Sequence, residues 1–121
     1  MVSVPSASAA MAWAPPTLLL DRVPALTAVL ASTDVLALET LRTLQARSIA
    51  VPGQVSVIGF DDVPDAAAAG LTTMAQPLVE KGRASAQLLL DLIRRGEQSR
   101  IILPTELMVR TSTAPPPADQ S

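Results

Sequence analysis

Acidic side chains at the end of an apolar run are the residues of this sequence whose types and spacing could do chemistry. The stretch "VSVIGF" (55–60) is followed directly by Asp61 and Asp62. A carboxylate at the end of a buried strand is costly unless it is paired, and it can accept hydrogen bonds from the hydroxyls of a ligand. Neighbouring residues of an extended chain point to opposite sides, so we expect Asp61 to bind a ligand and Asp62 to form a turn or a cap.

A further acidic residue, Asp34, follows a second apolar stretch, "LTAVLAS" (26–32). In an open parallel sheet, ligands bind outside the carboxyl ends of the strands, and both acidic positions then lie along one edge of the sheet. Asp34 also has an interpretation without a ligand. Thr33 and Asp34 precede a segment with helical periodicity, and capping that helix is worth about 1 kcal/mol.

The elements that must position these carboxylates alternate in type. Residues 26–32 predict a short buried strand, and residues 35–48 predict a helix because apolar side chains recur at 37, 38, 41 and 44. "VPG" (51–53) breaks this helix, and residues 55–60 predict the next strand. A strand, a helix and a strand with short connections favour a βαβ unit, and therefore an α/β fold with a parallel sheet.

The second half of the chain continues the alternation. Residues 64–70 indicate a turn or short helix, and residues 71–76 predict a third extended piece. A helix over 78–95 is indicated by proline in its first turn, arginines in its last turn and Gly96 after it. Residues 100–110 predict an extended segment that Pro104 interrupts.

Composition narrows the function classes. The 121 residues suffice for one domain, and 9 Lys plus Arg against 11 Asp plus Glu give a net charge of −2 without a basic run, which argues against a nucleic-acid surface. Without cysteine or histidine, thiolate and imidazole chemistry are excluded, so we expect no enzyme, no metal site and no cofactor. The amino terminus does not have the composition of a signal peptide and no apolar run could span a bilayer, which predicts a cytoplasmic protein.

Taken in order, these segments resemble the LacI/GalR family of bacterial transcriptional regulators over about residues 26–116. The resemblance rests on the strand–Asp–helix pattern, "VPGQVSVIGFDD" (51–62), "LTTMAQP" (71–77), the long helix and "LPTELMVR" (103–110). It implies a periplasmic-binding-protein-like (type I) fold with a parallel sheet, incomplete and mostly the carboxyl-terminal of two subdomains. We therefore expect a flexible leader at 1–25, a partial sensor domain at 26–112 and a disordered tail at 113–121.

The resemblance also implies site residues and partners. Asp61 matches the family's effector-binding aspartate, and Thr33, Asp34 and Gln76 are implied as further ligand-binding residues for a sugar or a nucleobase-like effector, with a carbohydrate favoured. The resemblance further implies a homodimer, with a dimer face formed by the helix from Asp34 to Arg47 and the loop 66–69. Its residues would be Leu38, Leu41, Arg42, Ala66 and Ala69. Operator DNA would be bound only through an amino-terminal headpiece that precedes the matched region in family members and is missing here.

Some features depart from the family or leave other functions open. Thr33 stands where many members have Asn, and the helix 78–95 belongs by resemblance to the other subdomain, so its stripe at 78, 82, 86, 89 and 93 is expected to lack a partner within this chain. A periplasmic sugar-binding protein of the same fold is one alternative. An enzyme, such as a phosphoacceptor domain of receiver size, is another, although a receiver would place the acidic pair after its first strand.

Overall fold

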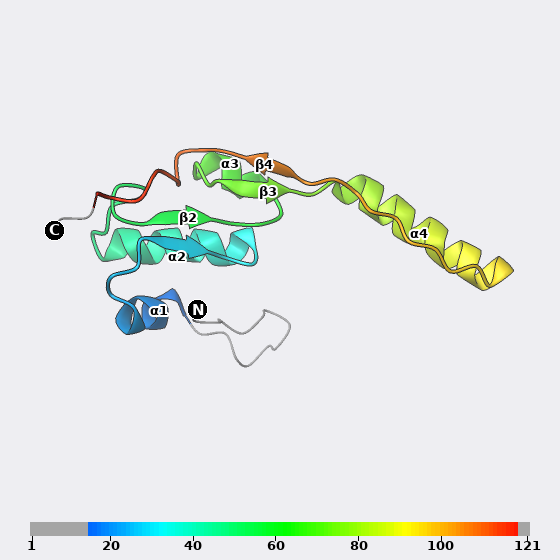
Figure 1. Ribbon diagram of the computed structural model, residues 1–121, viewed down its shortest axis with the longest axis horizontal. Helices are drawn as coiled ribbons and strands as arrows, with labels where there is room; N and C mark the ends of the chain where they lie inside the picture. Colours follow the sequence, from blue (N-terminus) through cyan, green and yellow to red (C-terminus); the bar gives the residue numbers. More distant parts are fainter. Residues whose placement is uncertain (1–14, 119–121) are drawn as a thin grey trace.

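The computed structural model describes residues 15–118 as an α/β body from which one long helix projects (Figure 1). We call α4 together with the extended segment 96–105 the arm, and the rest of the described residues the body. The elements in chain order are α1 (Pro16–Arg22), β1 (Ala28–Leu30), α2 (Asp34–Ala46), β2 (Ser56–Ile58), α3 (Pro64–Ala68), β3 (Thr73–Ala75), α4 (Leu78–Arg95) and β4 (Glu106–Met108).

The strands form two two-stranded sheets, β1–β2 and β3–β4, which isolated parallel bridges join side by side. β1 pairs with β2 in parallel, with Val29 opposite Val57. β3 runs in the same direction as β2, to which it is joined by single parallel bridges, including one between Asp61 and Ala75. β4 then returns antiparallel to β3, with Met74 opposite Leu107. The predicted α/β fold with a parallel sheet is confirmed, although each strand is shorter than the apolar run that predicted it.

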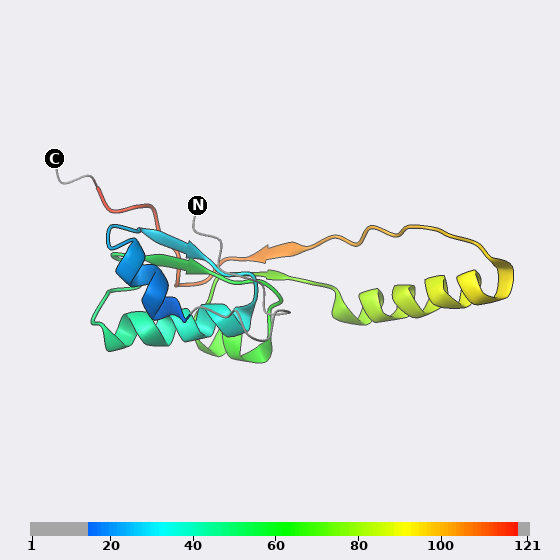
Figure 2. The ribbon, with the colours of Figure 1, turned by 90° about the horizontal axis from the view of Figure 1, so that it is seen from below.

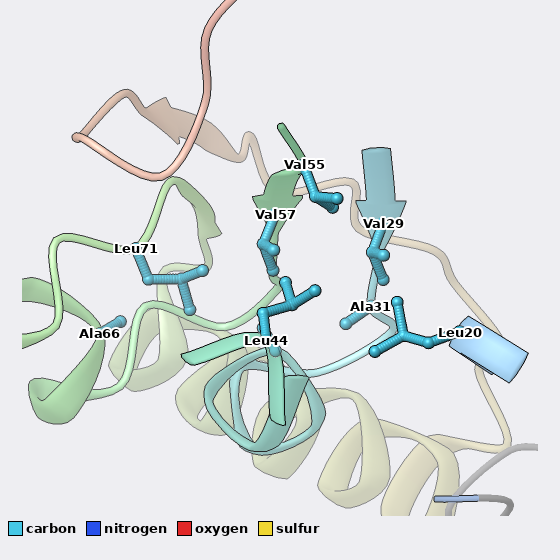
Figure 3. Packing of buried hydrophobic residues seen from close by; sticks show 9 residues of the cluster. Leu20, Val29, Ala31, Leu44, Val55, Val57, Ala66 and Leu71 are labelled. Atoms are coloured by element: carbon cyan, nitrogen blue, oxygen red, sulfur yellow. The ribbon is translucent and has the colours of Figure 1, made fainter. Parts of the chain in front are cut away.

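The core of the body lies between the sheet and α2. Thr33 is extended and its hydroxyl accepts a hydrogen bond from the Leu36 amide (3.3 Å), which starts the helix. From that start, α2 turns Ala37 and Leu44 inward, and both are fully buried. Figure 3 shows Leu44 directed at the sheet beside Val57. The buried apolar cluster comprises Leu20, Val29, Ala31, Ala37, Leu44, Val55, Val57, Ala66 and Leu71.

Residues 16–22 form α1, whereas the sequence predicted a flexible leader as far as residue 25. Leu20 of this helix is buried in the core cluster, and Asp21 accepts a hydrogen bond from the Arg47 guanidinium at the end of α2 (2.8 Å). Pro16 in the first turn supplies a φ that suits a helix start. A short helix is therefore held by tertiary contacts that the local sequence did not reveal. Residues 1–14 lie outside the described part of the chain.

The start of the predicted tail also packs on the body. The hydroxyls of Thr72 and Thr113 are hydrogen-bonded (2.8 Å), and the amide of Ala114 donates to Ser56 Oγ (3.0 Å). Just before them, buried Ser112 accepts a hydrogen bond from the Val57 amide through its carbonyl oxygen (2.8 Å). Thr113 and Ala114 therefore do not fit the expected disordered tail, and residues 119–121 lie outside the description.

The arm leaves the body at the end of β3. Figures 1 and 2 show α4 extending away from the sheet, with the chain returning beside it to β4. The helix ends at Gly96, which adopts the left-handed conformation (φ 68°) that glycine tolerates, and no residue of α4 is buried. The stripe at 78, 82, 86, 89 and 93 is exposed along its whole length in the described chain.

Candidate functional site

Asp34 is completely buried at the start of α2. Its Oδ2 accepts a hydrogen bond from the Val63 amide (2.9 Å), and its Oδ1 accepts one from the Thr73 hydroxyl (2.5 Å). A side chain at Gly59 would collide with Oδ1, so glycine there makes the close approach of β2 to this carboxylate feasible. The carboxylate therefore ties α2 to β3 and to the start of α3.

Neither sequence interpretation of Asp34 describes this arrangement. The capping interpretation is wrong in detail, because the Thr33 hydroxyl caps the helix and Asp34 is its first residue. Asp34 also has no solvent-exposed surface through which it could contact a ligand. Thr33 is half-buried and its hydroxyl makes the cap. Of Thr33 and Asp34, only Thr33 therefore has solvent-accessible surface.

Asp61 and Gln76 are brought together at the carboxyl ends of β2 and β3. Gln76 Nε2 donates to Asp61 Oδ1 (2.7 Å), and the Lys81 ammonium donates to Gln76 Oε1 (3.0 Å). Lys81 carries only donors and Asp61 only acceptors, so the orientation of the amide between them is fixed by chemistry. Asp61 and Gln76 are both half-buried and thus combine partial desolvation with access.

Asp62 points to a different partner, as expected for adjacent residues. Its Oδ1 accepts a hydrogen bond from Arg110 Nη2 (2.7 Å) in an ion pair whose side chains are 25% and 18% exposed, respectively. Of the two roles predicted for Asp62, the cap is wrong, because the residue before α3 is Val63 and it makes no side-chain cap. Asp62 lies instead in the turn between β2 and α3, at a φ of 60°. Sequence reasoning missed Arg110, since the two residues are 48 positions apart and no local signal links them.

The backbone at this acidic pair is unusual. Asp61 has φ 124° and Asp62 has φ 60°, both in the region that non-glycine residues rarely adopt. The Asp61 amide nevertheless donates to the Met74 carbonyl (2.9 Å), so the turn stays attached to β3. Such outliers persist where surrounding contacts over-determine them, and they are concentrated at functional sites.

An open groove lined by residues of α2, of the α3 region and of the chain near Thr111 contains most of the predicted dimer-face residues. It has a volume of about 620 Å³ and is lined in part by Leu38, Leu41, Arg42 and Ala69. Ala66 is instead fully buried in the core, so its predicted place on the surface is wrong. The acidic residues of the described range form no group that could hold a metal ion, and none of its helices is long and apolar enough to cross a membrane.

Comparison with known proteins assigns the chain to a class and then to a family. The model of the periplasmic binding protein-like domain matches residues 2–113, and the chain belongs to that class. An HTH-type transcriptional regulator of Mycobacterium tuberculosis is 50% identical over 95 residues, which are 78% of this chain and 26% of the relative. CelR of Thermobifida fusca is 43% identical over 98 residues, covering 78% of this chain and 29% of the relative.

Solved structures give the same assignment. A complex of the transcriptional regulator CelR with cellobiose is 40% identical with a TM-score of 0.74, covering 80% of this chain and 31% of that one. A LacI family regulator from Enterococcus faecium with bound ribose is 39% identical with a TM-score of 0.69, covering 83% of this chain and 38% of that one. The chain therefore matches part of the sensor domain of LacI-family transcriptional regulators, and it spans about a quarter of the length of the Mycobacterium tuberculosis relative.

Proposed function

We propose that this chain forms part of the effector-binding and dimerisation region of a regulator that controls transcription in response to a carbohydrate. The observation that carries the proposal is the Asp61–Gln76 pair at the carboxyl ends of β2 and β3. The named relatives are transcriptional regulators, which favours this function over a periplasmic sugar-binding protein or an enzyme. Operator binding would come from a headpiece in the complete regulator, acting on chromosomal DNA in the cytoplasm.

The chemistry of the pair suits a hydroxyl group. A carboxylate has about four sites for hydrogen bonds, so Asp61 keeps acceptor capacity after Gln76 has used one of them. The amide nitrogen of Gln76 has two N–H groups and donates one to Asp61. The pair thus offers an acceptor and a donor side by side, whereas a sugar hydroxyl is both donor and acceptor. Thr33 stays a proposed contact of lesser weight because its hydroxyl also caps α2.

The test needs the rest of a sensor domain around this site. We suggest a hybrid in which residues 15–118 replace the matching segment of CelR, with calorimetry against cellobiose and ribose, the sugars seen in the two solved relatives. Asp61→Asn removes a charged acceptor and should weaken sugar binding about 10-fold or more. The matched variant Asp91→Asn, on α4 beside Gln87, should keep the parent affinity. Equal affinity in the parent and in Asp61→Asn would remove Asp61 from the effector site.

The groove beside α2 supports the proposed homodimer. Its apolar members Leu38 and Leu41 are only half-buried in the single chain, and they adjoin Arg42 on the same helix. A second copy covering this groove would desolvate those side chains, and burial of apolar surface drives association. Closed two-fold dimers use the same surface patch on both subunits, so a single substitution changes both halves of the interface.

Sedimentation equilibrium of the hybrid at micromolar concentration tests the dimer. Leu38→Glu places a charge in the groove and should shift the protein toward monomer. Val35→Glu is the matched control, because Val35 lies on the same helix, is 68% exposed and does not line the groove. If Leu38→Glu and Val35→Glu sediment alike, the groove is not the dimer face.

A further inference from the structure

The acidic turn after β2 holds two consecutive non-glycine residues at positive φ, 124° at Asp61 and 60° at Asp62. L-residues other than glycine resist this region because the Cβ crowds the backbone. Aspartate visits the left-handed region of Asp62 occasionally, but two consecutive residues at positive φ persist only where surrounding contacts hold them. The orientation of the Asp61 carboxylate depends on this backbone, because a change of φ at Asp61 or Asp62 redirects the chain between β2 and α3.

Arg110 supplies contacts that fit this need. Its guanidinium donates through Nη2 to Asp62 Oδ1 (2.7 Å) and through Nη1 to the carbonyl oxygen of Leu71 (2.9 Å). Its own amide donates to Thr72 Oγ1 (2.9 Å), which fixes the backbone from which the side chain reaches. One planar guanidinium thus contacts both the turn, at Asp62, and the segment just before β3, at Leu71. A lysine ammonium is a compact point charge and does not reproduce that fork.

We propose that Arg110 is a positioning residue for the effector site. By holding the Asp62 carboxylate against the residues before β3, Arg110 keeps the Asp61–Asp62 turn at positive φ and so directs the Asp61 carboxylate toward Gln76. The role of Asp61 in binding rests on the proposed function, whereas the effect of Arg110 on the turn does not. Arg110 itself needs no contact with the effector.

The prediction concerns a hydrogen bond of the turn, so it can be tested on the full 121-residue chain without any ligand. The Asp61 amide, which donates to Met74 O (2.9 Å), reports on the turn. The Ala31 amide, which donates to Ile58 O (2.9 Å) between β1 and β2, reports on the body as a whole. Hydrogen exchange of both amides is compared by NMR in the parent chain, Arg110→Met, Asp62→Gly and the double variant.

Arg110→Met should lower the protection of the Asp61 amide about 10- to 100-fold relative to that of Ala31, the loss expected from a hydrogen bond to a charged group. Glycine adopts positive φ at no steric cost, so Asp62→Gly should make the turn largely independent of Arg110. In the Asp62→Gly background, Arg110→Met should therefore have much less effect on the Asp61 amide. This rescue separates positioning from general stabilisation.

Three outcomes would overturn the proposal. The protection of the two amides could fall equally in Arg110→Met, which would make Arg110 a general stabiliser. The Asp61 amide could lack protection from exchange in the parent, or keep its protection in Arg110→Met. Either result would mean that Arg110 does not hold the Asp61–Asp62 turn in place. Arg110→Met could also act as strongly in the Asp62→Gly background, which would mean that it does not act through Asp62. Failure of sugar binding in the hybrid would refute the proposed function and leave these results unchanged.

Discussion

The body and the arm are both built from apolar-rich sequence, yet they use it in opposite ways. In the body, Leu44, Val57 and Leu71 have no exposed surface. In the arm, α4 is the longest helix of the described chain, but no residue of it is buried and Leu89 is 56% exposed. Apolar periodicity therefore predicts a helix correctly in both regions, but the apolar side chains are buried only in the body.

The difference separates helix formation from helix packing. α4 has strong helix formers, a basic last turn at Arg94 and Arg95 and a glycine stop at Gly96, all of which act locally. α2 also has local signals, including the Thr33 cap, and in addition it covers a sheet that buries its inward face. Most helical stability in proteins comes from such packing, so the arm should be the less stable region and the body the cooperative one.

The largest expected effect comes from truncating matched leucines in the two regions. Leu44→Ala opens a cavity in the core of the body and should lower the free energy of unfolding by about 2–5 kcal/mol. Leu89→Ala removes side-chain surface that is already in water and should change it by less than about 0.5 kcal/mol. Urea unfolding followed by circular dichroism, with both variants on the full chain, measures the difference.

The contrast between the two leucines fails if Leu89→Ala is as destabilising as Leu44→Ala. That result would mean that the α4 stripe is covered in solution, either by the body or by another molecule. A concentration dependence of the unfolding midpoint would then separate the two cases, because only association responds to protein concentration.

The sequence predicted best what depends on neighbouring residues. The bounds of α4 agree with the predicted 78–95, because proline and glycine signal helix ends locally. The parallel pairing of β1 with β2 was also predictable from apolar runs and short connections. Asp61 was singled out by its place at the end of an apolar run and Gln76 only by the resemblance to a known family, and the structure places their side-chain atoms 2.7 Å apart.

The contacts that sequence reasoning missed join distant positions. Thr73 donates to Asp34 across 39 residues, and Arg110 pairs with Asp62 across 48. Each pair forms only after strands from separate parts of the chain have come together, and nothing local marks either partner. Asp34 was accordingly expected to cap a helix or to bind a ligand, and Asp62 to form a turn or a cap, because capping is a common local role of an aspartate near a helix start.

A second prediction compares glycines at a tight site and an open one within the body. Gly59→Ala would drive its Cβ into Asp34 Oδ1 and crowd Ala37 and Leu71, which should cost about 1–3 kcal/mol of unfolding free energy. In Gly53→Ala, the new Cβ would make only an ordinary contact with Ala50 at 3.6 Å, so stability should change by less than about 0.5 kcal/mol. Thermal unfolding midpoints of the two variants measure the difference. Equal midpoints would show that the residues around Asp34 rearrange to accept the new Cβ at little cost in stability.

The smallest expected effect is a gain, and it lies in the arm. Gly82 is interior to α4, and no atom lies within 4 Å of where its Cβ would be. Gly82→Ala should therefore stabilise the helix by about 0.8–1 kcal/mol through propensity alone. Because α4 is not packed on the body, this gain should raise the helical circular dichroism signal and the exchange protection of α4 amides, while the urea midpoint of the body stays unchanged. An upward shift of that midpoint by the full amount would instead show that arm and body unfold as one cooperative unit, which the lack of any buried residue in α4 argues against.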